Sequence, residues 1–235
     1  MNRIRIISGI FEKEIKDLLK NLQVLILFFV YPVVALIMTS AMSGQLDLNS
    51  GTFFISIFAT MHSVFSPIVA TVSIISEEKE KNTLRALIMS NVKPLDYLIS
   101  IGGFIFIATM LSGLIFLFAG SFRSEDILKL LLSMSIGTIC SIILGLSIGA
   151  FSKNMAAANA ISVPVGMVFA FLPMLATFNK KIADFSRFTY GYQISKLISN
   201  NSLNIAFADW MVILANLIIF IFMFIIAFKR NKLEN

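Results

Sequence analysis

The sequence predicts an all-helical integral membrane protein with six transmembrane helices, and three observations lead to this prediction. Hydrophobic residues make up 57% of the 235 residues and charged residues only 14%, whereas a soluble domain is usually about one quarter charged. The mean hydropathy is +0.88. Six apolar stretches each have about the 20 residues needed to cross a hydrocarbon core of about 30 Å. Together they predict one transmembrane domain over 1–235, with spans at roughly 22–43, 52–75, 97–119, 127–150, 156–176 and 209–228.

Two of these stretches are less regular than the others. The second is the weaker one because it holds the polar residues His62, Ser63 and Ser66. The fifth contains Pro164 and Pro173. Because proline lacks a backbone N–H, we expect this helix to kink or to end early.

The sequence predicts no cofactor or metal site in this chain, and no catalytic residues. His62 and Cys140 are the single residues of their types, which is too few for a zinc or haem site. A buried hydrogen bond to a neighbouring helix is the expected role of His62. The phosphate-binding motif that ends in Gly-Lys-Ser/Thr does not occur, so we do not expect this chain to hydrolyse ATP.

The distribution of basic residues predicts that both termini lie in the cytoplasm. With the N-terminus inside, the inner segments hold 13 of the 19 Lys and Arg residues, as the positive-inside rule requires. The segment between the fifth and sixth spans is the exception, since it holds four of the six outer basic residues. These six are Arg123, Lys129, Lys180, Lys181, Arg187 and Lys196.

Residues 1–21 predict an amphipathic helix that lies in the membrane interface. Ile7, Phe11, Ile15 and Leu18 recur at spacings of three and four, with charged residues on the other faces. The alternative is a solvated helical extension.

The densest group of charges follows the second span and predicts a cytoplasmic helix over 76–92. Glu77 and Glu78 suit the first turn of a helix, and Glu77 is four residues from Lys81, as in a stabilising ion pair. Pro94 would follow its end. From the residues alone, an ordinary solvated loop helix is an equally good interpretation.

Two sequence runs in this region resemble the cytoplasmic loop of ABC-2-type permeases, the membrane subunits of ATP-driven exporters. Asn82 stands where that family usually has Gly, and Asn91 where it usually has the first Pro. The resemblance also extends to the order of the segments along the whole chain. The two runs are Glu77-Glu78-Lys79-Glu80-Lys81-Asn82-Thr83-Leu84 and Val92-Lys93-Pro94-Leu95-Asp96-Tyr97-Leu98.

The resemblance implies an ABC-2 exporter fold and a specific set of partners. The helix at 76–92 would couple the permease to a separate ATPase subunit, present in two copies, which binds ATP and Mg²⁺. A second permease, identical or homologous, would complete the complex, and the substrate would be an apolar or amphipathic peptide, lipid or drug. The implied ATPase contacts are Glu77, Glu78, Glu80, Lys81, Thr83, Leu84 and Arg85.

The resemblance also implies an extracellular re-entrant segment at 177–208, before the last span. The aromatic residues of this segment favour contact with the outer membrane interface. A surface loop without a gating role is the alternative.

Small residues at every fourth position of the fourth span predict close helix packing in lipid. The neighbouring helix could belong to the same subunit or to a second copy. The residues are Ser133, Gly137, Ser141, Gly145 and Gly149.

Other functional classes remain open from the sequence. A membrane scaffold, a channel subunit or an ion-coupled carrier would share the six spans. Carriers usually hold ionisable residues within their spans, and these are nearly absent here, which favours a chain driven by a separate motor.

Overall fold

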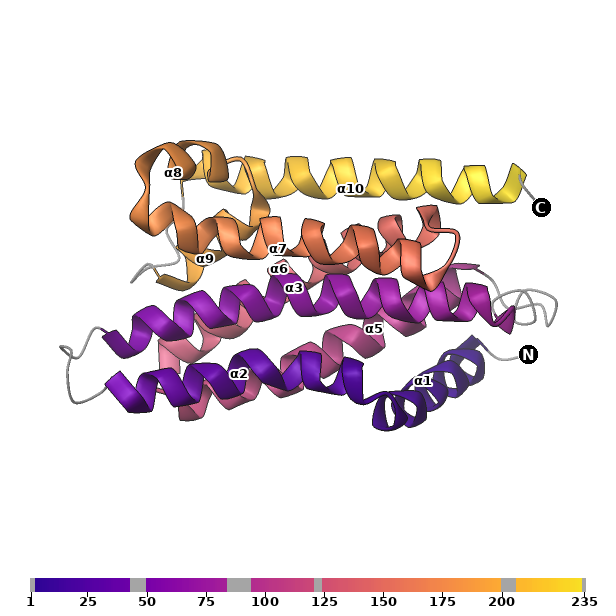
Figure 1. Cartoon of the computed structure of the whole chain (residues 1–235), viewed down its shortest axis with the longest axis horizontal. Helices are drawn as coiled ribbons and strands as arrows, with labels where there is room; N and C mark the ends of the chain where they lie inside the picture. Colours follow the sequence, from indigo (N-terminus) through magenta and orange to yellow (C-terminus); the bar gives the residue numbers. More distant parts are fainter. Residues whose placement is uncertain (1–2, 43–49, 84–93, 121–123, 200–205, 234–235) are drawn as a thin grey trace.

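The computed structural model describes residues 3–42, 50–83, 94–120, 124–199 and 206–233. These residues form a bundle of long helices that lie side by side (Figure 1). The helices are α1 (Arg3–Lys20), α2 (Leu22–Met42), α3 (Ser50–Glu80), α5 (Pro94–Gly113), the 3-10 turn η1 (Leu114–Phe118), α6 (Ser124–Phe151), α7 (Met155–Phe178), α8 (Lys180–Ser186), α9 (Tyr190–Ser199) and α10 (Phe207–Leu233).

In the described part of the chain, six helices are long and apolar enough to cross a membrane, namely α2, α3, α5 with η1, α6, α7 and α10. The all-helical class with six spans is therefore confirmed. An even number of spans returns the chain to the side where it began, and both termini lie at the same end of the bundle (Figure 1). The helices α8 and α9 lie at the opposite end.

The second span, α3, is the central helix of the bundle rather than its weakest element. Of its membrane-spanning residues 83% are buried, against 17% for α10. It is 31 residues long, continues through Pro67, and contacts α2, α5, α6, α7 and α9. Its polar residues are compatible with a span because they face protein rather than lipid.

The polar side chains of α3 form hydrogen bonds to neighbouring helices. Ser66 Oγ donates to a backbone carbonyl of α2 at 2.9 Å, and His62 Nε2 donates to the carbonyl oxygen of Thr109 in α5 at 3.0 Å. Ser141 of α6 donates to the carbonyl oxygen of Ser63 at 3.1 Å. These bonds satisfy groups that have no access to water, and His62 has the role predicted for it.

The small residues of α6 allow its backbone to approach α3 closely. A Cβ added at Gly145 would lie 2.7 Å from Thr71 Cβ and 3.0 Å from the Ile68 carbonyl oxygen. A Cβ at Gly149 would lie 3.1 Å from Ile75 Cβ. At these glycines the neighbour is a helix of the same chain. Gly137 and Ser141 also contact α3, and Ser133 is buried.

The fifth span, α7, continues through both of its prolines and ends at Phe178. The expected early end is therefore wrong. Asn154 begins the helix, because its side-chain oxygen accepts a hydrogen bond from the backbone N–H of Ala157 at 2.8 Å.

Between α7 and α10 the chain forms two short helices, α8 and α9, which lie at the far end of the bundle from the termini (Figure 1). Tyr190 is fully buried there, and its hydroxyl lies 2.9 Å from Ser141 Oγ. Position 191 requires glycine because a Cβ there would lie 2.2 Å from the Phe169 carbonyl oxygen. Exposed aromatic residues from the end of α7 to the start of α10 include Phe178, Phe185, Phe188 and Phe207.

The first helix, α1, lies at an angle to α2 and packs against α5 (Figure 1). Ile10 and Glu14 are buried, and the Phe11 ring meets the Phe104 ring edge to face at 5.6 Å. Ile15 is 43% exposed. Glu14, which the sequence analysis did not assign to a face, therefore packs against the bundle, whereas Ile15 of the predicted apolar face lies outward. The position of α1 in the membrane interface stays a prediction.

We predict that Gly145→Leu reduces the yield of folded protein and lowers its melting temperature in detergent. The added side chain must displace Thr71 or the α3 backbone, and overpacking typically costs about 1–3 kcal/mol. The control is Gly103→Leu in α5, since a Cβ there meets nothing within 4 Å. Equal melting temperatures for the two variants would contradict close packing at Gly145.

Candidate functional site

The charged segment predicted as one helix over 76–92 is divided by a turn at Asn82. The helix α3 continues to Glu80, and Asn82 has a φ of 57°, in the left-handed region. Asn is the residue that best replaces Gly in this conformation at a helix end. The prediction of one uninterrupted helix over 76–92 is therefore wrong at Asn82. The remainder of that segment, including Leu84 and Arg85, lies outside the described residues.

Glu77 and Glu78 lie in the last turn of α3, not in the first turn of a separate helix as predicted. A carboxylate at a helix C-terminus meets the negative end of the helix dipole, so nearby cations must compensate for it. For Glu77 the cation is Lys81, at 2.5 Å and four residues away, which confirms the predicted pair. Because Lys81 is 65% exposed, solvent screens the pair and its contribution to stability is small.

Glu78 joins three helices at one point. Its carboxylate is buried, and one oxygen accepts a hydrogen bond from Lys13 of α1. The other oxygen accepts one from the Tyr97 hydroxyl, in the first turn of α5. Because Lys13 is 38% exposed, removing one partner costs less than the ~3–5 kcal/mol typical of a fully buried ion pair. Glu78 therefore holds the end of α3 to α1 and to the start of α5.

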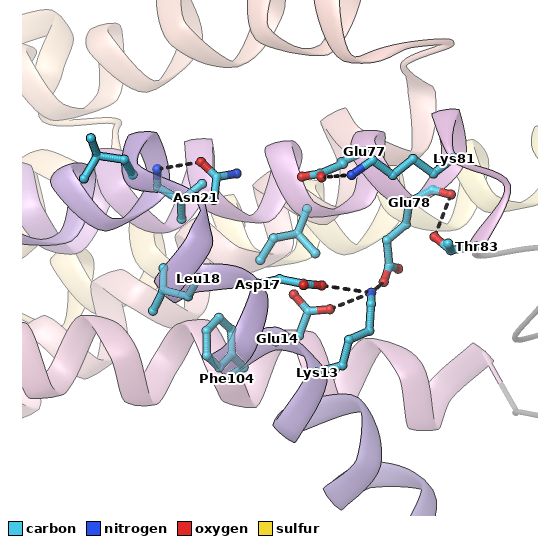
Figure 2. Close-up of a pocket in the computed structure, with 13 residues that line it drawn as sticks. Lys13, Glu14, Asp17, Leu18, Asn21, Glu77, Glu78, Lys81, Thr83 and Phe104 are labelled. Atoms are coloured by element: carbon cyan, nitrogen blue, oxygen red, sulfur yellow. Dashed lines mark hydrogen bonds and ion pairs between the residues drawn. The ribbon is translucent and has the colours of Figure 1, made fainter.

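The Lys13 ammonium group is surrounded by carboxylates (Figure 2). It lies 3.1 Å from Glu14 Oε1 and 3.9 Å from Asp17 Oδ2, in addition to its bond with Glu78. Burial alone would lower the pKa of Lys13, but the hydrogen bond and the negative charge of Glu78 outweigh burial and raise that pKa. Lys13 is therefore a firmly charged link between α1 and α3.

Glu14 is a buried acid that the sequence analysis missed. Burial raises the pKa of its carboxyl group from the ordinary 4.5 to about 7, against the opposing effect of Lys13. A signal was present in the sequence, because Glu14 lies four residues from both Ile10 and Leu18. An acid at that spacing shares a helix face with its apolar neighbours.

Lys79 and Glu80 hold the turn between α6 and α7. The Lys79 ammonium group donates to the carbonyl oxygens of Ala150 at 2.9 Å and Ser152 at 2.7 Å. A cation at the C-terminus of α6 complements that helix dipole. Glu80 Oε2 accepts a hydrogen bond at 3.1 Å from the backbone N–H of Met155, the first residue of α7. The two side chains therefore complete two helix ends that meet beside α3.

A cavity of about 490 Å³ lies between α1, the end of α3 and α5. Carboxylates and two ammonium groups line one side of it, and apolar side chains line the other (Figure 2). The lining residues are Lys13, Glu14, Asp17, Leu18, Asn21, Leu22, Val24, Ile74, Glu77, Glu78, Lys81, Thr83 and Phe104.

The structure thus divides the predicted ATPase contacts into two groups. Glu77, Lys81 and Thr83 lie at least partly exposed at the end of the bundle. Glu78 and Glu80 interact with other helices of the same chain. No ATPase is present in the structure, so the contact assignment stays a prediction for all of them.

The described residues hold six membrane-spanning helices, of which the polar α3 is the most buried and ends in a charged turn, and this arrangement defines a multi-pass membrane protein. The chain matches the family model described as ABC-2 family transporter protein over residues 14–229. It therefore belongs to this family, and the resemblance found in the sequence is confirmed. A comparison with curated proteins finds no significant match. Membership makes the chain a permease subunit of an ABC transporter and implies association with an ABC ATPase.

We predict that the docking of α1 weakens as the pH rises from about 6 to about 8. The folded-state pKa of Glu14 is raised to about 7, so its contribution to stability is complete below about pH 4.5 and is lost as the pH rises through 7. Hydrogen exchange of residues 3–20, corrected for intrinsic rates, measures the effect. Glu14→Gln should remove the pH dependence.

The control is Glu12→Gln, which changes an exposed carboxylate paired with Lys16 on the same helix. It should leave the pH dependence as it is in the parent protein. A parent-like pH dependence in Glu14→Gln would show that Glu14 does not titrate in this range.

Proposed function

We propose that this chain is the permease subunit of an ATP-driven exporter and moves an apolar or amphipathic substrate out of the cytoplasm. The observation that supports this best is the path of α3, the most buried span, which ends in a charged turn at the end of the bundle that holds both termini (Figure 1). A movement imposed on this turn would act directly on the centre of the bundle.

We place the charged end of α3 in the cytoplasm of a bacterial cell. The end of the bundle that holds both termini also holds Lys79, Lys81 and Lys153, in agreement with the positive-inside rule. The opposite end, with α8 and α9, would then lie outside, and α1 would lie in the inner interface. Phe185 and Phe188 are exposed at that end, where they could contact the outer leaflet. Their exposure supports a re-entrant or capping role for 177–208.

Cysteine labelling tests this orientation. Lys153 and Lys181 are both exposed and lie at opposite ends of the bundle, while the native Cys140 is buried. In a Cys140→Ala background, a membrane-impermeant maleimide should label Lys181→Cys in intact cells, and Lys153→Cys only after the membrane is opened. The reverse pattern would refute the orientation.

We propose that the ATPase contacts the part of the charged segment that faces outward. Glu77, Lys81 and Thr83 are described residues of this surface, Glu80 is exposed beside them while it binds Met155, and Leu84 and Arg85 follow in the sequence. Glu78 and Glu80 would act indirectly, by fixing the position of the turn. Two ATPase subunits would bind ATP and Mg²⁺, and two permeases would form the path between them.

Co-purification with an ABC ATPase, sought first among the genes next to this one, tests the contact. Lys81→Glu combined with Leu84→Asp should greatly reduce both co-purification and stimulated ATP hydrolysis, because it reverses a charge and removes an apolar contact. The matched control at the other end of the bundle is Lys181→Glu combined with Phe185→Asp. Undiminished co-purification of the Lys81 and Leu84 variant would refute this contact.

The same complex distinguishes the exporter from the other classes. Transport that survives ATP depletion and stops with the proton gradient would indicate a secondary carrier. If no ABC ATPase is encoded near this gene or co-purifies with the chain, a scaffold or channel subunit becomes the better interpretation.

A further inference from the structure

The last turn of α3 makes polar contacts with α1, α5, α6 and α7, through consecutive side chains that point to different sides. Glu78 binds Lys13 of α1 and Tyr97 of α5. Lys79 binds the end of α6, and Glu80 binds the start of α7. We call the first set the α1 arm and the second set the α6–α7 arm.

We propose that this turn distributes one movement into two separate parts of the bundle, with Lys13 and Lys79 as positioning residues for the two arms. The inference rests on the proposed function, in which an ATPase displaces the segment that begins at Lys81. Neither lysine is among the proposed ATPase contacts, so changing either one should leave the ATPase bound.

The geometry supports two separate arms because the contacts are polar and directional. The α1 arm uses Glu78 of α3, whereas the α6–α7 arm uses Lys79 and Glu80. Lys79 meets two carbonyl oxygens of the α6 end at 2.9 and 2.7 Å, a geometry that fixes the position of that end relative to α3. The bond between Lys13 and Glu78 fixes the position of α1 in the same way. Without the Lys79 bonds, the α6–α7 arm keeps the bond between Glu80 and Met155 and the more distant bond between Ser141 and Ser63. Without the Lys13 bond, α1 loses its link to Glu78.

The test follows each arm with its own fluorescent label in the reconstituted complex of permease and ATPase. Gly9→Cys reports on α1, where an added Cβ meets nothing within 4 Å. Lys153→Cys reports on the exposed turn between α6 and α7. Both labels are placed in the Cys140→Ala background, and their emission is compared without nucleotide and with ATP plus vanadate.

Lys13→Met should abolish most of the ATP-induced change at position 9 and preserve it at position 153. Lys79→Met should have the opposite effect. Lys13→Arg and Lys79→Arg retain the charge and the donors, so they should restore the changes. A purely structural role would not produce this reciprocal pattern, because general destabilisation reduces both signals together.

Three outcomes would overturn the inference. If neither Met variant changes its own arm, or if either variant reduces both signals equally, the arms are not separate positioning devices. If the unsubstituted complex forms but shows no ATP-induced change at either label, the turn distributes no movement. Failure of the ATPase to bind the unsubstituted permease would instead refute the proposed function, and this inference with it.

Discussion

The arrangement of this bundle depends on the burial of one polar helix, α3, at the centre of a protein that otherwise faces lipid. Helices in a membrane gain little from apolar contact with each other, because lipid is equally apolar. Close backbone approach and hydrogen bonds between helices must replace that driving force. The glycines of α6 provide the first at Gly145 and Gly149, and Ser63, Ser66 and His62 provide the second.

The same burial explains the arrangement of charges at the end of α3. A central helix that reaches the membrane surface is still surrounded by other helices, so part of its charged last turn cannot be solvated. Glu78 is buried and requires Lys13 and Tyr97. The Lys79 ammonium group donates to the carbonyl oxygens of Ala150 and Ser152 at the C-terminal end of α6. Thus the charged side chains of the last turn form hydrogen bonds with the ends of neighbouring helices, and these bonds link α3 to the helices around it.

The sequence predicted the spans well and their packing less well, for a physical reason. Span length is set by bilayer thickness, so hydropathy alone identified all six helices. Hydropathy does not indicate whether a helix faces lipid or protein, and the polar residues of α3 therefore weakened its signal although they mark the centre. The stripe of α6 predicted close packing, but spacing within one helix could not identify α3 as the neighbour.

The sequence predicted which residues form the charged site at the end of α3, but it predicted only some of the contacts between them. The sequence identified the charged run and the pair of Glu77 with Lys81, because that pair is local. The partners of Glu78 and Glu80 come from distant helices, Lys13 in α1 and Met155 in α7, which no local pattern could reveal. Glu14 was missed because an acid on an apolar face is normally assigned to solvent.

Asn82 separates two parts of the charged segment that differ in their contacts and in their direction. Before it, Glu78, Lys79 and Glu80 are bound by helices of the same chain. After it, the chain has left the axis of α3, since a left-handed residue changes the direction of the backbone. A continuous helix would have carried Thr83 along that axis. The turn allows the part that we propose to meet the ATPase and the part that holds the bundle to point in different directions, while only two residues separate the end of α3 from Thr83.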